Sequence, residues 1–207
     1  MKGIVIHSSK DKQICLCGVK GAGKKTFCSL FIPDKKVSIK NISLRKNIKK
    51  MLIIILFDGI HQQNLAEENV INEIQDFMKA TSSKIKLEIW GVLTKVDAFY
   101  NKRKDSSEIM RMYLSYKKLL NKRNIILTYF IPLAQIACYY LLYILKADEG
   151  NSEEECLNLL MMLGRIGIRF TEDNDFVKLK DYVQQHKGLL MNFTGYGIIK
   201  RHLLEWT

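Results

Sequence analysis

Two short motifs contain the residues whose types and spacing could do chemistry. The first, "GVKGAGKKT" from Gly18 to Thr26, nearly matches the phosphate-binding loop G-x-x-x-x-G-K-S/T. Glycines at these positions would let backbone N–H groups close around phosphate oxygens, and Lys24 would reach the terminal phosphates. If nucleotide binding is retained, we expect the loop to contact the nucleotide through Gly18, Gly21, Gly23, Lys24, Lys25 and Thr26.

The second motif is "LTKVD", which ends at Asp97 after an apolar stretch. It resembles the guanine-reading N/T-K-x-D motif of Ras-like GTPases. The resemblance implies that Asp97 accepts two hydrogen bonds from the guanine edge and that the stem of Lys95 packs over the base, with Thr94 beside them. A buried acceptor of this kind rejects bases that cannot donate.

The loop departs from the GTPase pattern at one position that matters for metal binding. A Ser or Thr hydroxyl should follow the loop lysine to hold Mg²⁺, but Lys25 stands there and Thr26 comes one residue late. An ammonium about 4 Å from a metal costs on the order of 4 kcal/mol at an effective dielectric near 20. We therefore expect no metal site, unless a one-residue shift of register places Thr26 there.

The region that senses and hydrolyses the terminal phosphate is also short. GTPases carry a D-x-x-G motif after the strand that follows the first switch, but here Asp58-Gly59 is the only Asp-Gly at a strand end. Only one helix and one strand are expected between Asp58 and the T-K-x-D motif. The 18 residues of "PDKKVSIKNISLRKNIKK" must then replace both switches. We expect no catalytic residues and weak or absent GTPase activity.

The elements that must position these motifs alternate between strands and helices. Apolar runs predict strands over 12–18, 51–57, 86–95 and 125–131, and "KVSIKNISL" predicts an edge strand. Helical spacing predicts helices over 64–80, 106–122 and 132–146. This order predicts an α/β fold with a mainly parallel sheet, here a Ras-like G domain with a shortened switch region.

One segment could instead cross a membrane. Residues 125–145 carry no charge over 21 residues, which is long enough to span a bilayer. Pro132 splits the segment, however, and proline suits the first turn of a helix. We therefore favour a buried strand followed by a buried helix that starts at Pro132.

The chain divides into two predicted parts. Residues 1–170 would form the degenerate Ras-like G domain, and residues 171–207 a helical C-terminal appendage packed on it. Helices are expected over 151–166, 172–186 and 195–206.

Composition sets limits on partners and on cysteine chemistry. The formal net charge of +12 favours acidic partners, although the basic residues are spread along the chain and also suit a solubilising surface. The five cysteines lie in apolar stretches without metal-ligand spacing, which indicates buried free thiols.

A Ras-like fold without its switch elements resembles the centromere protein M family of inner-kinetochore pseudo-GTPases. The similarity covers residues 12–165 and rests on "KVSIKNISLRK", "MLIIILFDGIHQQNLAEENVINEI" and "EECLNLLMML". It implies a nuclear, centromeric scaffold that docks a helical-repeat kinetochore subunit, associates with chromatin indirectly, and needs no cofactor or small-molecule substrate. The glycine loop and T-K-x-D are closer to the GTPase pattern than in that family, so GTP or GDP stays an open ligand.

Three hypotheses remain open at this point. The first is the non-catalytic scaffold. The second is a guanine-nucleotide switch, nuclear or cytoplasmic, in which Lys25 neutralises phosphate charge in place of Mg²⁺. The third is a membrane-associated protein that uses residues 125–145 or the basic surface. Immune-associated GTPases share the "GAGK" and "VLTKVD" patterns but have far longer switch regions.

Overall fold

The computed structural model describes residues 2–8, 11–32, 40–42, 47–60, 65–81, 84–99, 106–146, 153–165 and 176–206. The sheet has the strand order β3-β1-β2-β4-β5-β6. Its strands are β1 (Lys2–Ser8), β2 (Lys12–Gly18), β3 (Lys40–Asn41), β4 (Lys50–Asp58), β5 (Lys86–Thr94) and β6 (Tyr129–Leu133). The helices are α1 (Lys24–Phe31), α2 (Leu65–Ala80), α3 (Val96–Phe99), α4 (Ser106–Asn121), α5 (Gln135–Lys146), α6 (Glu153–Arg165), α7 (Phe176–Gln185), α8 (Lys187–Phe193) and α9 (Tyr196–Leu204).

The centre of the sheet is parallel, which confirms the α/β prediction. Strands β2, β4, β5 and β6 pair in parallel, whereas β1 runs antiparallel to β2 and β3 antiparallel to β1. The register aligns Gly18 with Leu56, and Asp58 with Thr94. The residues that follow these strands therefore meet at one edge of the sheet, where open α/β sheets bind ligands.

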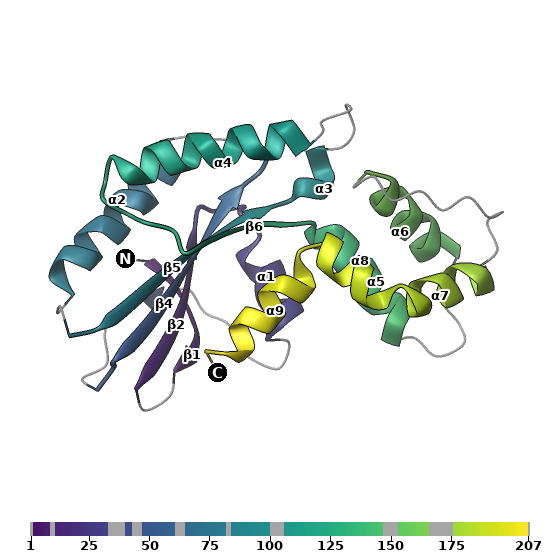
Figure 1. Cartoon of the computed structure of the whole chain (residues 1–207), viewed down its shortest axis with the longest axis horizontal. Helices are drawn as coiled ribbons and strands as arrows, with labels where there is room; N and C mark the ends of the chain where they lie inside the picture. Colours follow the sequence, from purple (N-terminus) through teal and green to yellow (C-terminus); the bar gives the residue numbers. More distant parts are fainter. Residues whose placement is uncertain are drawn as a thin grey trace.

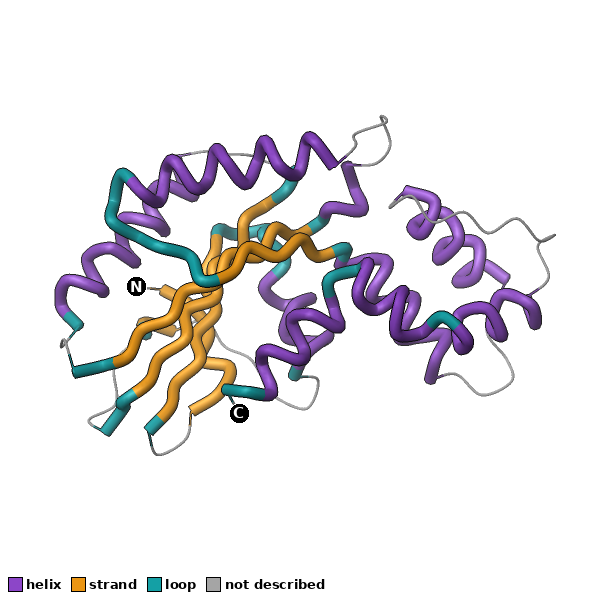
Figure 2. The backbone as a smooth tube through the Cα atoms, in the orientation of Figure 1, coloured by secondary structure: helices purple, strands orange, loops and turns teal. Residues whose placement is uncertain are grey.

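Strand β4 shows why the sequence forms a sheet covered on both faces. Its apolar run alternates between two cores: Leu52, Ile54 and Leu56 belong to one, and Ile53, Ile55 and Phe57 to the other. Helices α1, α5 and α9 contribute to the first core, and α2 and α4 to the second. Figures 1 and 2 show this three-layer arrangement, with α2 and α4 on one side of the sheet.

The segment around Pro132 differs from the prediction in one respect. A strand and a helix do replace the uncharged run, but Pro132 lies inside β6 and α5 begins at Gln135. Proline is tolerated in β6 because this is an edge strand, where the missing N–H breaks no ladder on the outer side. In the described ranges, no helix has the length and apolar character needed to cross a membrane.

Sequence reasoning missed two elements at the ends of the chain. Strand β1 was not predicted, although Ile4 and Ile6 are buried and Val5 between them is exposed. Helix α8 was also missed. Val37 and Ile39 of the predicted edge strand lie outside the described residues, and β3 is the described part of that segment.

The C-terminal helices share a core with the sheet. Leu179, Leu190 and Ile199, one from each of α7, α8 and α9, join the same buried cluster as Leu16 and Ile54. The backbone N–H of Ala134 donates to the carbonyl of Thr194 at 3.0 Å, which fastens the α8–α9 turn to the β6–α5 junction. The boundary near residue 171 stays a prediction.

The predicted free thiols are confirmed for four cysteines, Cys15, Cys17, Cys28 and Cys138, all of them buried. Burial raises the pKa of Cys15 to about 11 and that of Cys138 to about 12. The side chain of Cys156 lies outside the part of the chain that the structure describes.

We expect Gly195 to be required where the turn between α8 and α9 packs on the junction of β6 and α5. It has φ +81° at the N-cap of α9, and a Cβ there would collide with the carbonyl oxygen of Pro132. Gly195→Ala should lower the free energy of unfolding by about 2 kcal/mol or more in urea titrations. Gly188→Ala is the matched control: it meets open space within α8 and should raise stability by about 0.5–1 kcal/mol. Equal stabilities for the two variants would refute this view.

Cys138 should also make stability depend on pH. Its thiol stays neutral in the fold, where its pKa is about 12, but ionises near pH 9 once unfolded. The stability it contributes is complete below pH 9 and is lost between pH 9 and 12. The loss from pH 9 to 10 should be about 1 kcal/mol. Cys138→Ala should therefore show a shallower decline of the unfolding free energy over that interval, and identical slopes would count against the assignment.

Candidate functional site

The candidate site lies at the carboxyl ends of the parallel strands, around the loop between β2 and α1. Three loop glycines have positive φ: Gly18 at +147°, Gly21 at +93° and Gly23 at +82°. A Cβ on Gly18 would lie 2.7 Å from the carbonyl oxygen of Leu56, and one on Gly23 would collide with the Gln135 side chain. The loop therefore needs glycine for backbone conformation and for close packing.

Lys24 extends back into the loop. Its Nζ donates to the carbonyls of Gly18 at 2.6 Å and Val19 at 2.5 Å. Partial burial lowers the pKa of Lys24. Its ammonium thus stabilises the loop and lies where the sequence motif predicts a phosphate.

Lys25 and Thr26 occupy the exposed first turn of α1. The carbonyl of Thr26 accepts a hydrogen bond from Ser29 Oγ at 2.9 Å. Over the described ranges, no group of three or more His, Cys, Asp or Glu side chains is arranged to hold a metal ion. A positively charged side chain at this exposed turn, that of Lys25, would repel a divalent cation bound beside it.

Thr94 links the loop to the sheet. Its hydroxyl Oγ1 is buried and lies 3.0 Å from the carbonyl oxygens of both Ala22 and Phe57. The structure therefore brings the first residue of the T-K-x-D motif against the glycine loop. These two contacts hold the backbone of the loop on the strands.

Lys95 forms an ion pair with a buried carboxylate. Its Nζ lies 2.7 Å from Oδ2 of Asp58, which is 2% exposed. Oδ1 of Asp58 also accepts the backbone N–H of Ile60 at 2.9 Å. Lys95 itself has φ +58°, a strained conformation for a side-chain-bearing residue. The ammonium of the lysine whose stem was expected to pack over a base is thus paired with Asp58 at the end of β4.

Asp97 is fully buried and holds the N-terminus of α5. Its Oδ2 accepts the backbone N–H groups of Ile136 at 2.7 Å and Ala137 at 2.9 Å. These are two of the first N–H groups of the helix, which have no acceptor within it. The negative charge also lies at the positive end of the helix dipole. One oxygen of the carboxylate that was expected to read guanine, Oδ2, therefore caps a helix.

Gln135, the first residue of α5, completes the connection to the loop. Its Nε2 donates to the carbonyl of Gly23 at 3.1 Å, and the side chain is 2% exposed. Sequence reasoning did not identify it, because a glutamine after an apolar strand has no motif of its own. Its position between the loop and α5 could be found only from the fold.

Sequence reasoning also missed two interacting residues next to Asp58, which are Glu67 and Tyr116. Glu67 is buried in the first turn of α2, and its Oε1 accepts the backbone N–H of Asp58 at 3.1 Å. The hydroxyl of Tyr116 lies 3.0 Å from Glu67 Oε2. The space between Gly18, Glu67 and Ile71 has no room for a water molecule. The only feature of the sequence that pointed to this contact was Glu67 itself, on the helix that follows the strand ending at Asp58-Gly59.

Comparison of the chain with protein-family models, with curated proteins and with solved structures gives no match.

Removal of the Asp97 carboxylate tests its structural role. Asp97→Ala leaves two helix N–H groups without this acceptor and should lower the free energy of unfolding by about 1–3 kcal/mol in urea, without any nucleotide present. Asp97→Asn keeps an acceptor oxygen, so its free energy of unfolding should fall by less than that of Asp97→Ala. Asp76→Ala is the control, because Asp76 is an exposed acid on α2. Unchanged stability in Asp97→Ala would show that the cap is unimportant.

Proposed function

We propose that this chain is a non-catalytic Ras-like G domain that acts as a protein-docking scaffold. The observation that carries the proposal is the use of Asp97: its carboxylate is buried and its Oδ2 accepts two N–H groups at the N-terminus of α5, so a base that bonded this oxygen would compete with the helix. Lys95 is likewise engaged with Asp58. The residues of the guanine-reading motif thus stabilise the fold.

The topology around the loop strand supports the lack of catalysis. Strand β2 lies between β4 on one side and β1, which precedes the loop in the chain, on the other. Strand β4 ends at Asp58 with Gly59 directly after it. Neither neighbour therefore brings a D-x-x-G motif beside the loop, which is the arrangement that GTP hydrolysis would need.

The scaffold part of the proposal rests on the resemblance to the centromere protein M family. That resemblance suggests a nuclear helical-repeat kinetochore subunit as the partner. A hollow of about 500 Å³ beside edge strand β6 is a surface through which such a partner could bind. It is lined by Ile109, Met110, Tyr113, Phe130 and Pro132, and Met110 is 55% exposed.

A second candidate is a metal-independent guanine-nucleotide-binding protein. The observation in its favour is the loop itself, because its glycines keep positive φ and Lys24 places an ammonium against it. Lys25 would add a second positive charge for phosphate. Base recognition through Asp97 Oδ2 would still compete with its two hydrogen bonds to α5.

Nucleotide titration separates the two candidates. With a fluorescent GTP analogue, with and without Mg²⁺, the scaffold proposal expects no saturable binding at micromolar concentrations and no difference between wild type and Lys24→Ala. Lys20→Ala, an exposed loop position, is the control. Tight Mg²⁺-dependent binding that is lost in Lys24→Ala would overturn the proposal, and tight Mg²⁺-independent binding would favour the second candidate.

A gain-of-function variant sharpens this test. Lys25→Ser restores the G-x-x-x-x-G-K-S pattern, yet it leaves Asp97 and Lys95 engaged as before. We expect it to gain no Mg²⁺-dependent nucleotide binding. A gain would mean that Lys25 alone silences an otherwise complete site.

A further inference from the structure

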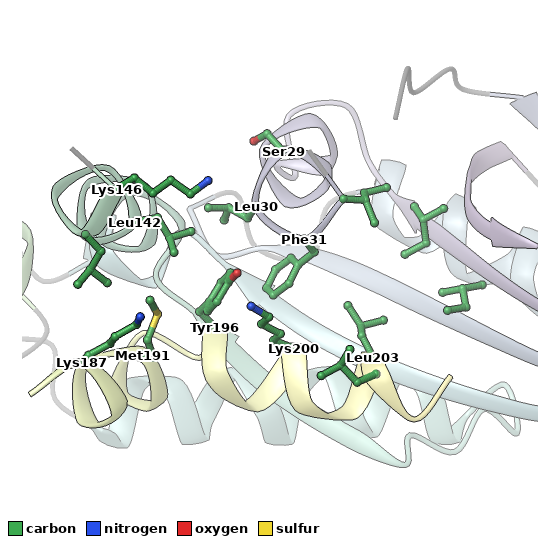
Figure 3. A pocket seen from close by; sticks show the side chains of 15 residues that line it. Ser29, Leu30, Phe31, Leu142, Lys146, Lys187, Met191, Tyr196, Lys200 and Leu203 are labelled. Carbon is green, nitrogen blue, oxygen red and sulfur yellow. The ribbon is translucent and has the colours of Figure 1, made fainter. Parts of the chain in front are cut away.

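A second site lies at the other end of α1, away from the glycine loop. A cavity of about 540 Å³ opens between the end of α1, the end of α5 and the helices α8 and α9 (Figure 3). This volume is within the range of small-molecule sites. None of the residues of the two sequence motifs lines it.

The interior of the cavity is mainly apolar. Its walls come from strands of the sheet and from helices on one face, and they include Leu30, Phe31, Leu142, Leu145, Met191 and Leu203. Phe31 stacks on Tyr196 with ring centroids 5.0 Å apart, which gives the cavity a firm wall. Such a surface favours methylene groups over water.

Three lysines from three different helices line the same cavity. Lys146 ends α5, Lys187 begins α8 and Lys200 lies in α9, and Figure 3 shows the three side chains around one space. Lys200 Nζ lies 5.6 Å from the ring centroid of Tyr196. All three are exposed. Among the residues that the structure describes, no acidic side chain lines the cavity and none forms an ion pair with these lysines.

We propose that this cavity binds a single-chain amphipathic anion, with the acyl chain in the apolar interior and a carboxylate or phosphate headgroup among the three ammonium groups. The apolar walls account for the chain, and the positive charges of the three lysines select the anion. The net charge of +12 would further attract such a ligand. The inference does not depend on the proposed scaffold function, because the site shares no residue with the glycine loop.

Displacement of cis-parinaric acid, a fluorescent fatty acid, gives the first test. Saturated fatty acids of 8, 12 and 16 carbons should bind with increasing affinity, by about fourfold for each added methylene until the cavity is filled. The corresponding alcohols should bind more weakly. A single-chain lysophosphatidic acid in the same assay distinguishes a phosphate from a carboxylate headgroup, and inorganic phosphate alone should not displace the probe.

Two variants address the two parts of the site. The triple variant Lys146→Gln, Lys187→Gln, Lys200→Gln should weaken binding of the acid about tenfold or more and leave the alcohol unchanged. Its control replaces Lys117, Lys118 and Lys122 by Gln, at exposed positions at or just after the end of α4. Leu142→Trp should fill the cavity and abolish binding of the acid and of the alcohol. Leu114→Trp, at an exposed position on α4, should leave both binding reactions unchanged.

The proposal fails if no fatty acid displaces the probe, if acid and alcohol bind equally, or if the triple variant and its control behave alike. It also fails if the protein binds anionic vesicles but extracts no fatty acid from them, since that outcome indicates a surface interaction only. If Leu142→Trp does not fold by circular dichroism, the lysine variants at exposed positions still decide the question.

Discussion

The structure around the candidate site depends on one buried carboxylate. Asp97, just after β5, accepts two N–H groups of α5 from residues 39 and 40 positions later in the chain, and so joins the end of that strand to the start of the helix. From that helix, Gln135 contacts the glycine loop through Gly23, and Thr94 contacts the same loop at Ala22. Loop, strand ends and α5 are therefore one hydrogen-bonded unit, and a charge in its interior is stabilised because Oδ2 of Asp97 accepts two N–H groups at the positive end of a helix.

Under the proposed function, this arrangement accounts for GTPase-like motifs in a domain without catalysis. A glycine loop that must pack against Leu56 and Gln135 needs its glycines for the fold itself. A lysine that bonds two loop carbonyls, and another that neutralises Asp58, have structural roles as well. Such roles would maintain the sequence pattern even where phosphate and base are not bound. The same residues can therefore support a rigid domain, which is what a docking scaffold requires.

Much of the parallel sheet could be predicted from sequence, because β2 and β4 are continuous apolar runs and β5 precedes a recognisable motif. The contacts that the motif residues make in the fold could not be predicted from sequence. The partners of Asp97 and Lys95 lie 37 to 40 residues away in sequence, and no local pattern specifies them. Pro132 misled the prediction because its role as a helix starter and its role in an edge strand have the same local signal.

Hydrogen exchange at two backbone amides tests the central claim most directly. The N–H groups of Ile136 and Ala137 should exchange slowly in the nucleotide-free protein, because Asp97 accepts both. Their protection should stay the same when GTP and Mg²⁺ are added in excess. Rapid exchange without nucleotide, or a change in protection on adding GTP, would show that the Asp97 carboxylate is available to a base and would contradict its assignment as a permanent helix cap.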